Sequence, residues 1–356
     1  MSTSKDKNTM LRRSQISVSE SNQGKLDILD SIIIESKRVI NLYINELWAR
    51  KDFSSKFIDF KVDTWLTYRM QQNLGKQALH TVRSRRKEKR HKPVYRKDSI
   101  DFDQRFLDIQ FDNNSFDVWI KLNCIGKKIS IKLPGRKHKH FFKYNRKDNQ
   151  WTLKKSIRLR KVGKKYFIDL IFEKSIPDLK SKGSEIGLDI GYKKLIVTSE
   201  NKKYDTGLEK VYEKISRKKQ GSRAFKRSLV ERDNKINESI NQLPFGQIKV
   251  IIAEDLKNVK HKSKRRIRKK FNNKLQRWSY SKVLNMLSLR CEESGIFFKK
   301  VPPAYTSQKC SSCGFTHKNN RSGEKFLCVN CKNNLDADYN AALNILALGS
   351  LRLPSR

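Results

Sequence analysis

Three stretches of sequence decide the fold of this chain: EIGLDIG at 185–191, VIIAEDL at 250–256 and LDADYNAALNIL at 335–346. Each carries an acidic residue at the edge of an apolar run, namely Asp189, Glu254 and Asp338. An acid on an otherwise buried strand costs free energy unless it is paired or binds a metal. A single acid at a strand end is commonly a surface residue or a helix cap. Two such acids on separate strands, followed by a third, favour one shared metal site.

The third stretch holds two acids that we expect to differ. Asp336 is well placed as the N-cap of a final helix. On that helix, positions 338, 341, 342 and 345 share one face, which reads Asp, Ala, Ala, Ile. Small residues around one acid indicate a face packed against a sheet. We therefore assign Asp336 a structural role and Asp338 a role in the site.

The order of elements from residue 184 onward predicts the architecture. Apolar runs indicate three strands in succession (EIGLDIG, KLIVTS and KKYDTG), then a charged helical region at about 207–240. The strand QIKVIIAE, a helix at about 275–294, the strand GIFFKKV and a last helix at about 337–347 follow. This β-β-β-α-β-α-β-α order is that of an RNase H-like domain. Glycines beside Asp189 would let another backbone or a ligand approach closely.

Four of the six cysteines form the pattern C-x2-C-x14-C-x2-C: Cys310, Cys313, Cys328 and Cys331. Four thiolates at such spacing predict one tetrahedral zinc ion. Four protein ligands leave no open position, so the predicted zinc is structural. The pattern lies just before the last helix and predicts an inserted zinc ribbon. A zinc site with two further thiols fits a reducing compartment better than a disulfide framework does.

The first half of the chain has a different pattern. Residues 24–82 show helical periodicity, whereas from about 100 to 178 apolar residues alternate, as in FLDIQFD, FDVWIKL, KISIKL, IRLRKV and KYFIDLIFE. We expect a helical segment followed by a small β-barrel or sheet. RRSQISVS at 12–19 is the candidate for an additional first strand. The stretch at 136–147, which we expect to be a cationic hairpin, mixes cations with Phe141, Phe142 and Tyr144. This mixture favours binding to a nucleic-acid backbone with some base stacking, and the alternative is a solvated hairpin with core aromatic residues.

The charge of the chain indicates a polyanionic partner. It has 80 Lys and Arg residues against 36 acids, a net charge of +44. A ribosomal or chromatin protein has a similar composition but does not need the separated acids. The candidate contacts to nucleic acid lie in three basic stretches: Arg83, Arg85 and Arg86; Arg136 and Lys137; and Lys257, Lys260, Lys262, Lys264, Arg265, Arg266, Arg268, Lys269 and Lys270. No apolar run is long enough for a membrane span, and no signal peptide is indicated, so we expect a cytoplasmic protein.

In these motifs the chain resembles the TnpB family, the RNA-guided nucleases of insertion sequences related to type V CRISPR effectors. EIGLDIGYKKLIVTS, VIIAEDL, RWSYSKVLNMLSLRCEESGI, VPPAYTSQKCSSCG and DADYNAALNIL carry the resemblance, over roughly 184–348. It implies an α+β multidomain protein with a helical recognition lobe, a β-barrel wedge domain and a RuvC nuclease domain with a zinc ribbon. The implied boundaries are 1–23 for an N-terminal segment, 24–92 for the recognition domain, 93–183 for the wedge domain, 184–304 and 336–356 for the nuclease domain, and 305–335 for the zinc ribbon.

The resemblance also implies a reaction and its partners. Two Mg²⁺ ions, about 4 Å apart, would be held by Asp189, Glu254 and Asp338 and would hydrolyse a phosphodiester. A guide RNA would pair with double-stranded target DNA next to a short adjacent motif. The alternative is a nucleic-acid-binding protein without cleavage, either an RNA-guided repressor or a basic zinc-ribbon protein that binds RNA. A transposase that joins DNA ends is a third alternative, and the oligomeric state stays open.

Overall fold

The computed structural model describes residues 9–50, 60–88, 91–113, 115–126, 128–146, 150–205, 207–256 and 278–350. The candidate nucleic-acid-binding lysines and arginines at 257–270 lie outside these described residues. The chain divides into two compact units, Met1–Ser175 and Ile176–Arg356, which are described separately. Among the described helices, none combines the length and the apolar character that crossing a membrane requires.

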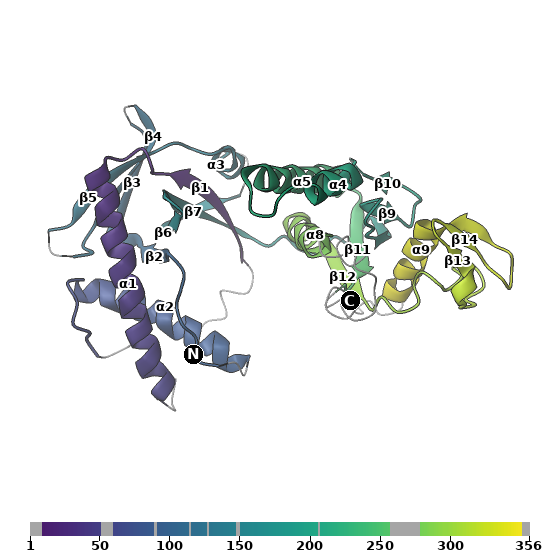
Figure 1. Ribbon diagram of the computed structural model, residues 1–356, viewed down its shortest axis with the longest axis horizontal. Helices are drawn as coiled ribbons and strands as arrows, with labels where there is room; N and C mark the ends of the chain where they lie inside the picture. The colour runs from purple at the N-terminus through teal and green to yellow at the C-terminus, as the bar shows by residue number, and fades with distance from the viewer. Residues whose placement is uncertain are drawn as a thin grey trace. The chain divides into compact units, whose positions relative to one another are not determined.

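The first unit combines helices with two antiparallel sheets (Figure 1). One sheet has the order β1-β7-β6-β2 and the other the order β3-β4-β5. The helices are α1 (Gln23–Ala49), α2 (Tyr68–Lys87) and α3 (Lys139–Tyr144), with a 3-10 turn η2 (Gln104–Phe106). The strands are β1 (Thr9–Ser17), β2 (Ser99–Asp103), β3 (Leu107–Asn113), β4 (Phe116–Asn123), β5 (Ser130–Gly135), β6 (Thr152–Val162) and β7 (Lys165–Ser175).

The expected N-terminal strand is confirmed, because β1 pairs along its whole length with β7. A single bridge between Ser17 and Arg136 also links β1 to the end of β5, so it joins the two sheets. Pairing between β2 and β3 is not recorded among the described residues, so a closed barrel stays a prediction. One hydrophobic core runs from Ile16 through both long helices to Phe172. The helices therefore pack on the same core as the strands.

The cationic hairpin expected at 136–147 is wrong, because α3 occupies its centre. Phe141 and Tyr144 lie three residues apart on one face of this helix and are buried. Both rings contact Phe172, each with 5.7 Å between ring centroids. In the sequence this spacing is hidden among alternating cations and aromatic residues. Burial of these two rings decides the local conformation.

The second unit contains a five-stranded sheet of order β10-β9-β8-β11-β12. The strands are β8 (Ser184–Asp189), β9 (Ile196–Thr198), β10 (Lys203–Tyr204), β11 (Ile248–Glu254) and β12 (Phe297–Val301). The first three pair antiparallel, whereas β11 runs parallel to both β8 and β12. The helices are α4 (Leu208–Ser216), α5 (Arg223–Asn241), α8 (Tyr280–Ser294) and α9 (Ala337–Ser350). The elements follow the order predicted from the sequence, except that the charged helical region is two helices, separated by a turn at Gly221 (φ +84°).

Alternation along the central strands sends side chains to two opposite faces. Ile251 and Ala253 of β11 belong to the core that includes α4, α5 and α8. Val250 and Ile252, which point the other way, pack with Ile345 of α9. The sheet is thus covered by helices on both faces, with α9 alone against the second face among the described helices (Figure 1).

Gly187 lets α9 lie directly on β8. A Cβ atom at this position would stand 2.2 Å from the carbonyl oxygen of Ala342 and 2.7 Å from the backbone nitrogen of Leu346. Backbone of the helix therefore occupies the space of a side chain, as expected for a glycine where another backbone approaches closely. The contact fixes how far along the sheet α9 sits.

Candidate active site and metal centre

Asp189 and Glu254 are brought together by parallel strands. The register pairs Leu188 of β8 with Ala253 of β11, so the next two residues end neighbouring strands at the same edge. Residues two apart on a strand point to the same face. Asp189 therefore shares the face of Gly187, and Glu254 shares the face of Ile252. Both acids therefore point to the face that α9 covers.

Asp338 reaches the same edge from α9. Ala341, Ala342 and Ile345 are buried against the sheet, which is the face predicted from the sequence. Asp336 caps the helix: its carboxylate accepts hydrogen bonds from the backbone nitrogens of Asp338 (3.0 Å) and Tyr339 (3.3 Å). The capping role expected for Asp336 therefore agrees with its geometry, and Asp338 lies in the first turn with its side chain 15% exposed.

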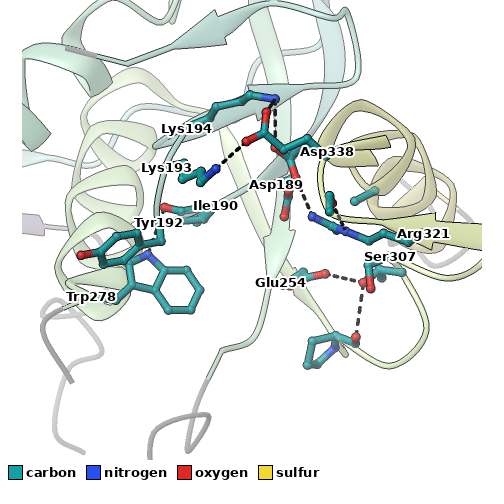
Figure 2. A pocket seen from close by; sticks show the side chains of 16 residues that line it. Asp189, Ile190, Tyr192, Lys193, Lys194, Glu254, Trp278, Ser307, Arg321 and Asp338 are labelled. Carbon is teal, nitrogen blue, oxygen red and sulfur yellow. Dashed lines mark hydrogen bonds and ion pairs between the residues drawn. The ribbon is translucent and has the colours of Figure 1, made fainter. Parts of the chain in front are cut away.

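Cations from two other segments surround Asp338 (Figure 2). Arg321 donates to one carboxylate oxygen of Asp338 at 2.9 Å, and the ammonium of Lys194 lies 3.4 Å from the other. Lys194 also forms an ion pair with Asp336 at 2.9 Å. Burial would lower the pKa of Lys194, but these two carboxylates outweigh it and raise the pKa, so the ammonium stays charged. No pattern in the sequence marks either cation, since both stand among many similar residues.

Burial dominates the electrostatics of the other two acids. Burial, together with the charges of Glu254 and Asp338, raises the pKa of Asp189 to about 8. Burial also raises the pKa of Glu254, although the hydroxyl of Thr306 donates to its carboxylate and opposes that rise. Carboxylates crowded away from water are stabilised in their ionised form by a bound cation. Oxygen-only ligands suit Mg²⁺.

Two buried asparagines of α9 hold the segment that carries Thr306. The side-chain amide of Asn344 donates to the carbonyl oxygens of Thr306 (2.9 Å) and Lys309 (2.7 Å). Asn340 also donates to Lys309 and accepts from the backbone nitrogen of Ser311 at 3.0 Å. Their i, i+4 spacing in an otherwise apolar helix was a readable signal, because buried amides need partners. Neither asparagine is among the site residues predicted from the sequence.

The three acids line one cleft of about 530 Å³. Lys193, Lys194 and Arg321 add positive charge to its walls, and Tyr192 and Trp278 add aromatic surface. Figure 2 shows Asp189 between Lys194 and Glu254, with Asp338 pointing towards the same space. A cleft with carboxylates at its floor and cations at its rim can hold metal ions together with a phosphate.

The four predicted zinc ligands converge on one point. Their sulfur atoms all lie within 4.8 Å of one another, and two pairs, Cys310–Cys331 and Cys313–Cys328, are each 3.6 Å apart. A tetrahedron with Zn–S bonds of about 2.3 Å has edges of about 3.8 Å. Zinc therefore fits this thiol cluster, and all six cysteines of the chain are free of disulfides.

The backbone around the thiols has the same turn twice. The backbone nitrogen of Gly314 (φ +77°) donates to the carbonyl oxygen of Cys310 at 3.0 Å. The backbone nitrogen of Lys332 (φ +60°) donates to the carbonyl oxygen of Cys328, also at 3.0 Å. A hydrogen bond from the backbone of Phe315 lowers the pKa of Cys313 to about 6, which favours a thiolate there. At Cys331 a backbone hydrogen bond from Asn333 lowers the pKa, but the other thiols of the cluster outweigh it and raise the pKa to about 12. The cysteines lie in turns, and the same segment contains η3 (Lys318–Asn320), β13 (Arg321–Ser322), β14 (Lys325–Leu327) and β15 (Asn334–Asp336). Because Arg321, which starts β13, and Glu324 line the cleft, this segment positions groups there.

Some of the candidate nucleic-acid-binding residues form hydrogen bonds or ion pairs within the protein. Arg86 donates to the carbonyl oxygens of Trp48 (2.7 Å) and Arg50 (2.9 Å). Lys137 is ion-paired with Asp112 and its side chain is 7% exposed. Arg136 keeps 65% of its side chain exposed, and Arg83 and Arg85 lie towards the end of α2. Contact of these residues with nucleic acid stays a prediction.

Comparison with known proteins finds relatives for parts of this chain. The family model for the Cas12f1-like TNB domain matches residues 280–345. A CRISPR-associated endodeoxyribonuclease Cas12f1 from Sulfoacidibacillus thermotolerans is 42% identical over 96 residues, which is 27% of this chain and 21% of that protein. The TnpB-like protein MJ0751 from Methanocaldococcus jannaschii is 32% identical over 111 residues, 30% of this chain and 39% of that protein. Over these segments the chain is similar to TnpB-like proteins and to type V CRISPR effectors.

Two further matches show how far the likeness extends. The putative RNA-guided DNA endonuclease InsQ from Escherichia coli K12 is 56% identical over 50 residues, 14% of this chain and 12% of that protein. A chain in a cryo-EM structure of the Cas12f1-sgRNA-target DNA complex has a TM-score of 0.61 and 15% identity, covering 91% of this chain and 83% of that one. The structural match shows a shared fold. The sequence matches span between 12% and 39% of the relatives' own lengths.

Proposed function

We propose that this TnpB-like chain is an RNA-guided DNA endonuclease whose RuvC-like site consists of Asp189, Glu254 and Asp338. The observation that carries the proposal is the meeting of three carboxylates from separate segments in one cleft. The relatives named as endodeoxyribonuclease and as putative RNA-guided DNA endonuclease support the same activity. The sheet order, with three antiparallel strands followed by two parallel ones, supports an RNase H-like domain.

The residues of the cleft have separate roles in binding metal and in binding the phosphate. Asp189, Glu254 and Asp338 would hold two Mg²⁺ ions, which supply an activated water and stabilise the leaving 3′ oxygen. Three cations, Lys193, Lys194 and Arg321, would attract and orient the phosphodiester by their positive charge. In the hydrolysis the oxygen of water bonds to phosphorus and the P–O3′ bond breaks, which leaves a 5′ phosphate and a 3′ hydroxyl. Thr306 fixes the orientation of Glu254.

The rest of the chain would bind nucleic acid by its positive charge. A guide RNA would select the target by base pairing, while the protein would bind the phosphate backbone of the RNA–DNA heteroduplex. We assign backbone contacts to the ten Lys and Arg residues of 257–274, on the basis of the sequence. The zinc ribbon would fix Arg321 and the start of α9 at the cleft.

The alternative, a guided binder that does not cleave, is disfavoured by the same acids. Carboxylates at the floor of a cleft repel phosphate unless cations are bound between them. A binder would gain nothing from raising the pKa of Asp189 by burial beside Glu254. The three acids therefore favour hydrolysis.

The test uses RNA that copurifies with the protein. Sequencing that RNA defines a target duplex, on which Asp189→Ala and Glu254→Ala should abolish Mg²⁺-dependent cleavage while affinity for the RNA changes by less than a few-fold. Glu200→Ala is the matched control, because Glu200 is an exposed acid of the same unit that pairs with Lys202. Cleavage at the wild-type rate by Asp189→Ala would refute the assignment of the site.

A further inference from the structure

Two aromatic side chains form one wall of the cleft and have no part in holding metal. Tyr192 and Trp278 line the same space as Asp189 and Glu254. Both residues are half-buried, and both border the cleft. In Figure 2 they stand to the left of Asp189, and Arg321 stands to its right.

A single buried residue, Tyr212 of α4, holds this wall in place. Its ring stacks on Tyr192 with 4.7 Å between centroids and 19° between planes. Its hydroxyl accepts a hydrogen bond from the backbone nitrogen of Ser279, the neighbour of Trp278, at 3.2 Å. The indole nitrogen of Trp278 donates to the carbonyl oxygen of Gly191 at 3.1 Å. The one polar atom of the indole is thus satisfied inside the protein, and both rings are fixed before any ligand arrives.

The position of the wall indicates what it binds. Gly191 lies two residues after Asp189, so the hydrogen bond ties the indole to the loop that follows this acid. Flat aromatic surface beside a cationic, metal-binding cleft matches a nucleotide, whose phosphate and base need these two surroundings. A base inside a duplex has both faces covered by its neighbours, whereas an unpaired base can stack on a side chain.

We propose that Trp278 and Tyr192 form a stacking wall for an unpaired base next to the phosphate in the cleft. This inference rests on the proposed function, because it takes the substrate strand to lie in the cleft. It specifies the substrate at the site as a single-stranded segment. Since every base has a π-face, the wall accepts all bases and adds binding without sequence preference.

The competing explanation is that the two rings only close the edge of the hydrophobic core, against which both pack. Substitutions can separate these roles. Trp278→Phe keeps an aromatic face but loses the hydrogen bond to Gly191, whereas Trp278→Leu loses both. Trp119→Leu, in the other unit, is the control for the same change elsewhere in the chain.

The experiment measures fluorescence of a single-stranded DNA tetranucleotide that contains one 2-aminopurine, in Mg²⁺, with all proteins carrying Glu254→Gln to prevent cleavage. Binding should quench the probe, and Trp278→Leu should weaken binding by roughly 5- to 100-fold, the range for loss of one base–aromatic stack. Trp278→Phe should retain most of the affinity, and Trp119→Leu all of it. A tetranucleotide with an abasic site in place of 2-aminopurine, used as an unlabelled competitor, should compete equally well for the parent protein and for Trp278→Leu.

Two results would overturn the stacking wall. One is unchanged probe affinity in Trp278→Leu; the other is equal weakening in the Phe and Leu variants, which would show that the hydrogen bond to Gly191 matters and the ring face does not. Cleavage by the wild-type chain is measured separately on the target duplex. A wild-type chain that binds the probe as expected but never cleaves would refute the proposed function and leave the stacking wall supported.

Discussion

Gly187→Ala tests the contact that positions Asp338. The added Cβ would stand 2.2 Å from the carbonyl oxygen of Ala342, whereas ordinary contact begins at 3.4 Å. The helix α9 must therefore move away from β8 by about 1.2 Å, because the atoms it meets belong to the helix backbone and cannot rotate away. Asp338 lies one turn before Ala342, so it moves with the helix.

The size of the effect follows from this displacement. Inserting a methyl group into a packed interface typically costs about 1–3 kcal/mol of unfolding free energy. A shift of about 1 Å in a catalytic group can cost about 100-fold in rate. We therefore expect a moderate loss of stability and a much larger relative loss of cleavage.

The assays are urea unfolding and single-turnover cleavage of the target duplex in Mg²⁺. Gly24→Ala is the matched control: Gly24 lies in the first turn of α1, and its Cβ would meet nothing within 4 Å. That variant should keep its cleavage rate and gain up to about 1 kcal/mol of stability. If Gly187→Ala has the unfolding midpoint and cleavage rate of the wild type, α9 does not rest on β8 as described.

Three further predictions follow from the site. Asp338→Ala should lose nearly all cleavage, whereas Asp336→Ala should cost about 0.5–2 kcal/mol of stability, as loss of an N-cap does, and keep measurable cleavage; the reverse ranking would exchange the two roles. Without added Mg²⁺, Asp189 keeps its proton to higher pH in the folded chain than in the unfolded one, so the free energy of unfolding should fall as pH rises from about 4 to about 8. Asp189→Asn should flatten that slope, and an unchanged slope in urea titrations would show that Asp189 is not its cause. Metal analysis should find about one zinc per chain, and Cys310→Ser should lower the melting temperature. Cys124→Ser, a change at an exposed thiol outside the cluster, should leave the melting temperature unchanged. Freshly purified protein without zinc would contradict the cluster's role.

The predictions that succeeded at the sequence level rest on local patterns. An apolar run that ends in an acid identifies a buried strand with a carboxylate at its tip, and this applies to both Asp189 and Glu254. The spacing of small residues after Asp338 gives the helix face that packs on the sheet. The CxxC pairs predict a zinc cluster because both turns are built by neighbouring residues. Each of these signals lies within a few residues of the feature it predicts.

What only the tertiary structure decided concerns partners that are distant in sequence. The parallel register of β8 and β11 sets Asp189 level with Glu254, and no pattern in either strand fixes that register. Arg321 reaches Asp338 because the segment with the four clustered cysteines folds back on α9, so one arginine among many becomes part of the candidate site. Burial of Phe141 and Tyr144 against a distant strand turned the expected hairpin into a helix. Backbone preferences act between neighbours along the chain, whereas side-chain packing and charge pairing act between any groups that the fold brings within a few ångströms, and only the folded chain shows which these are.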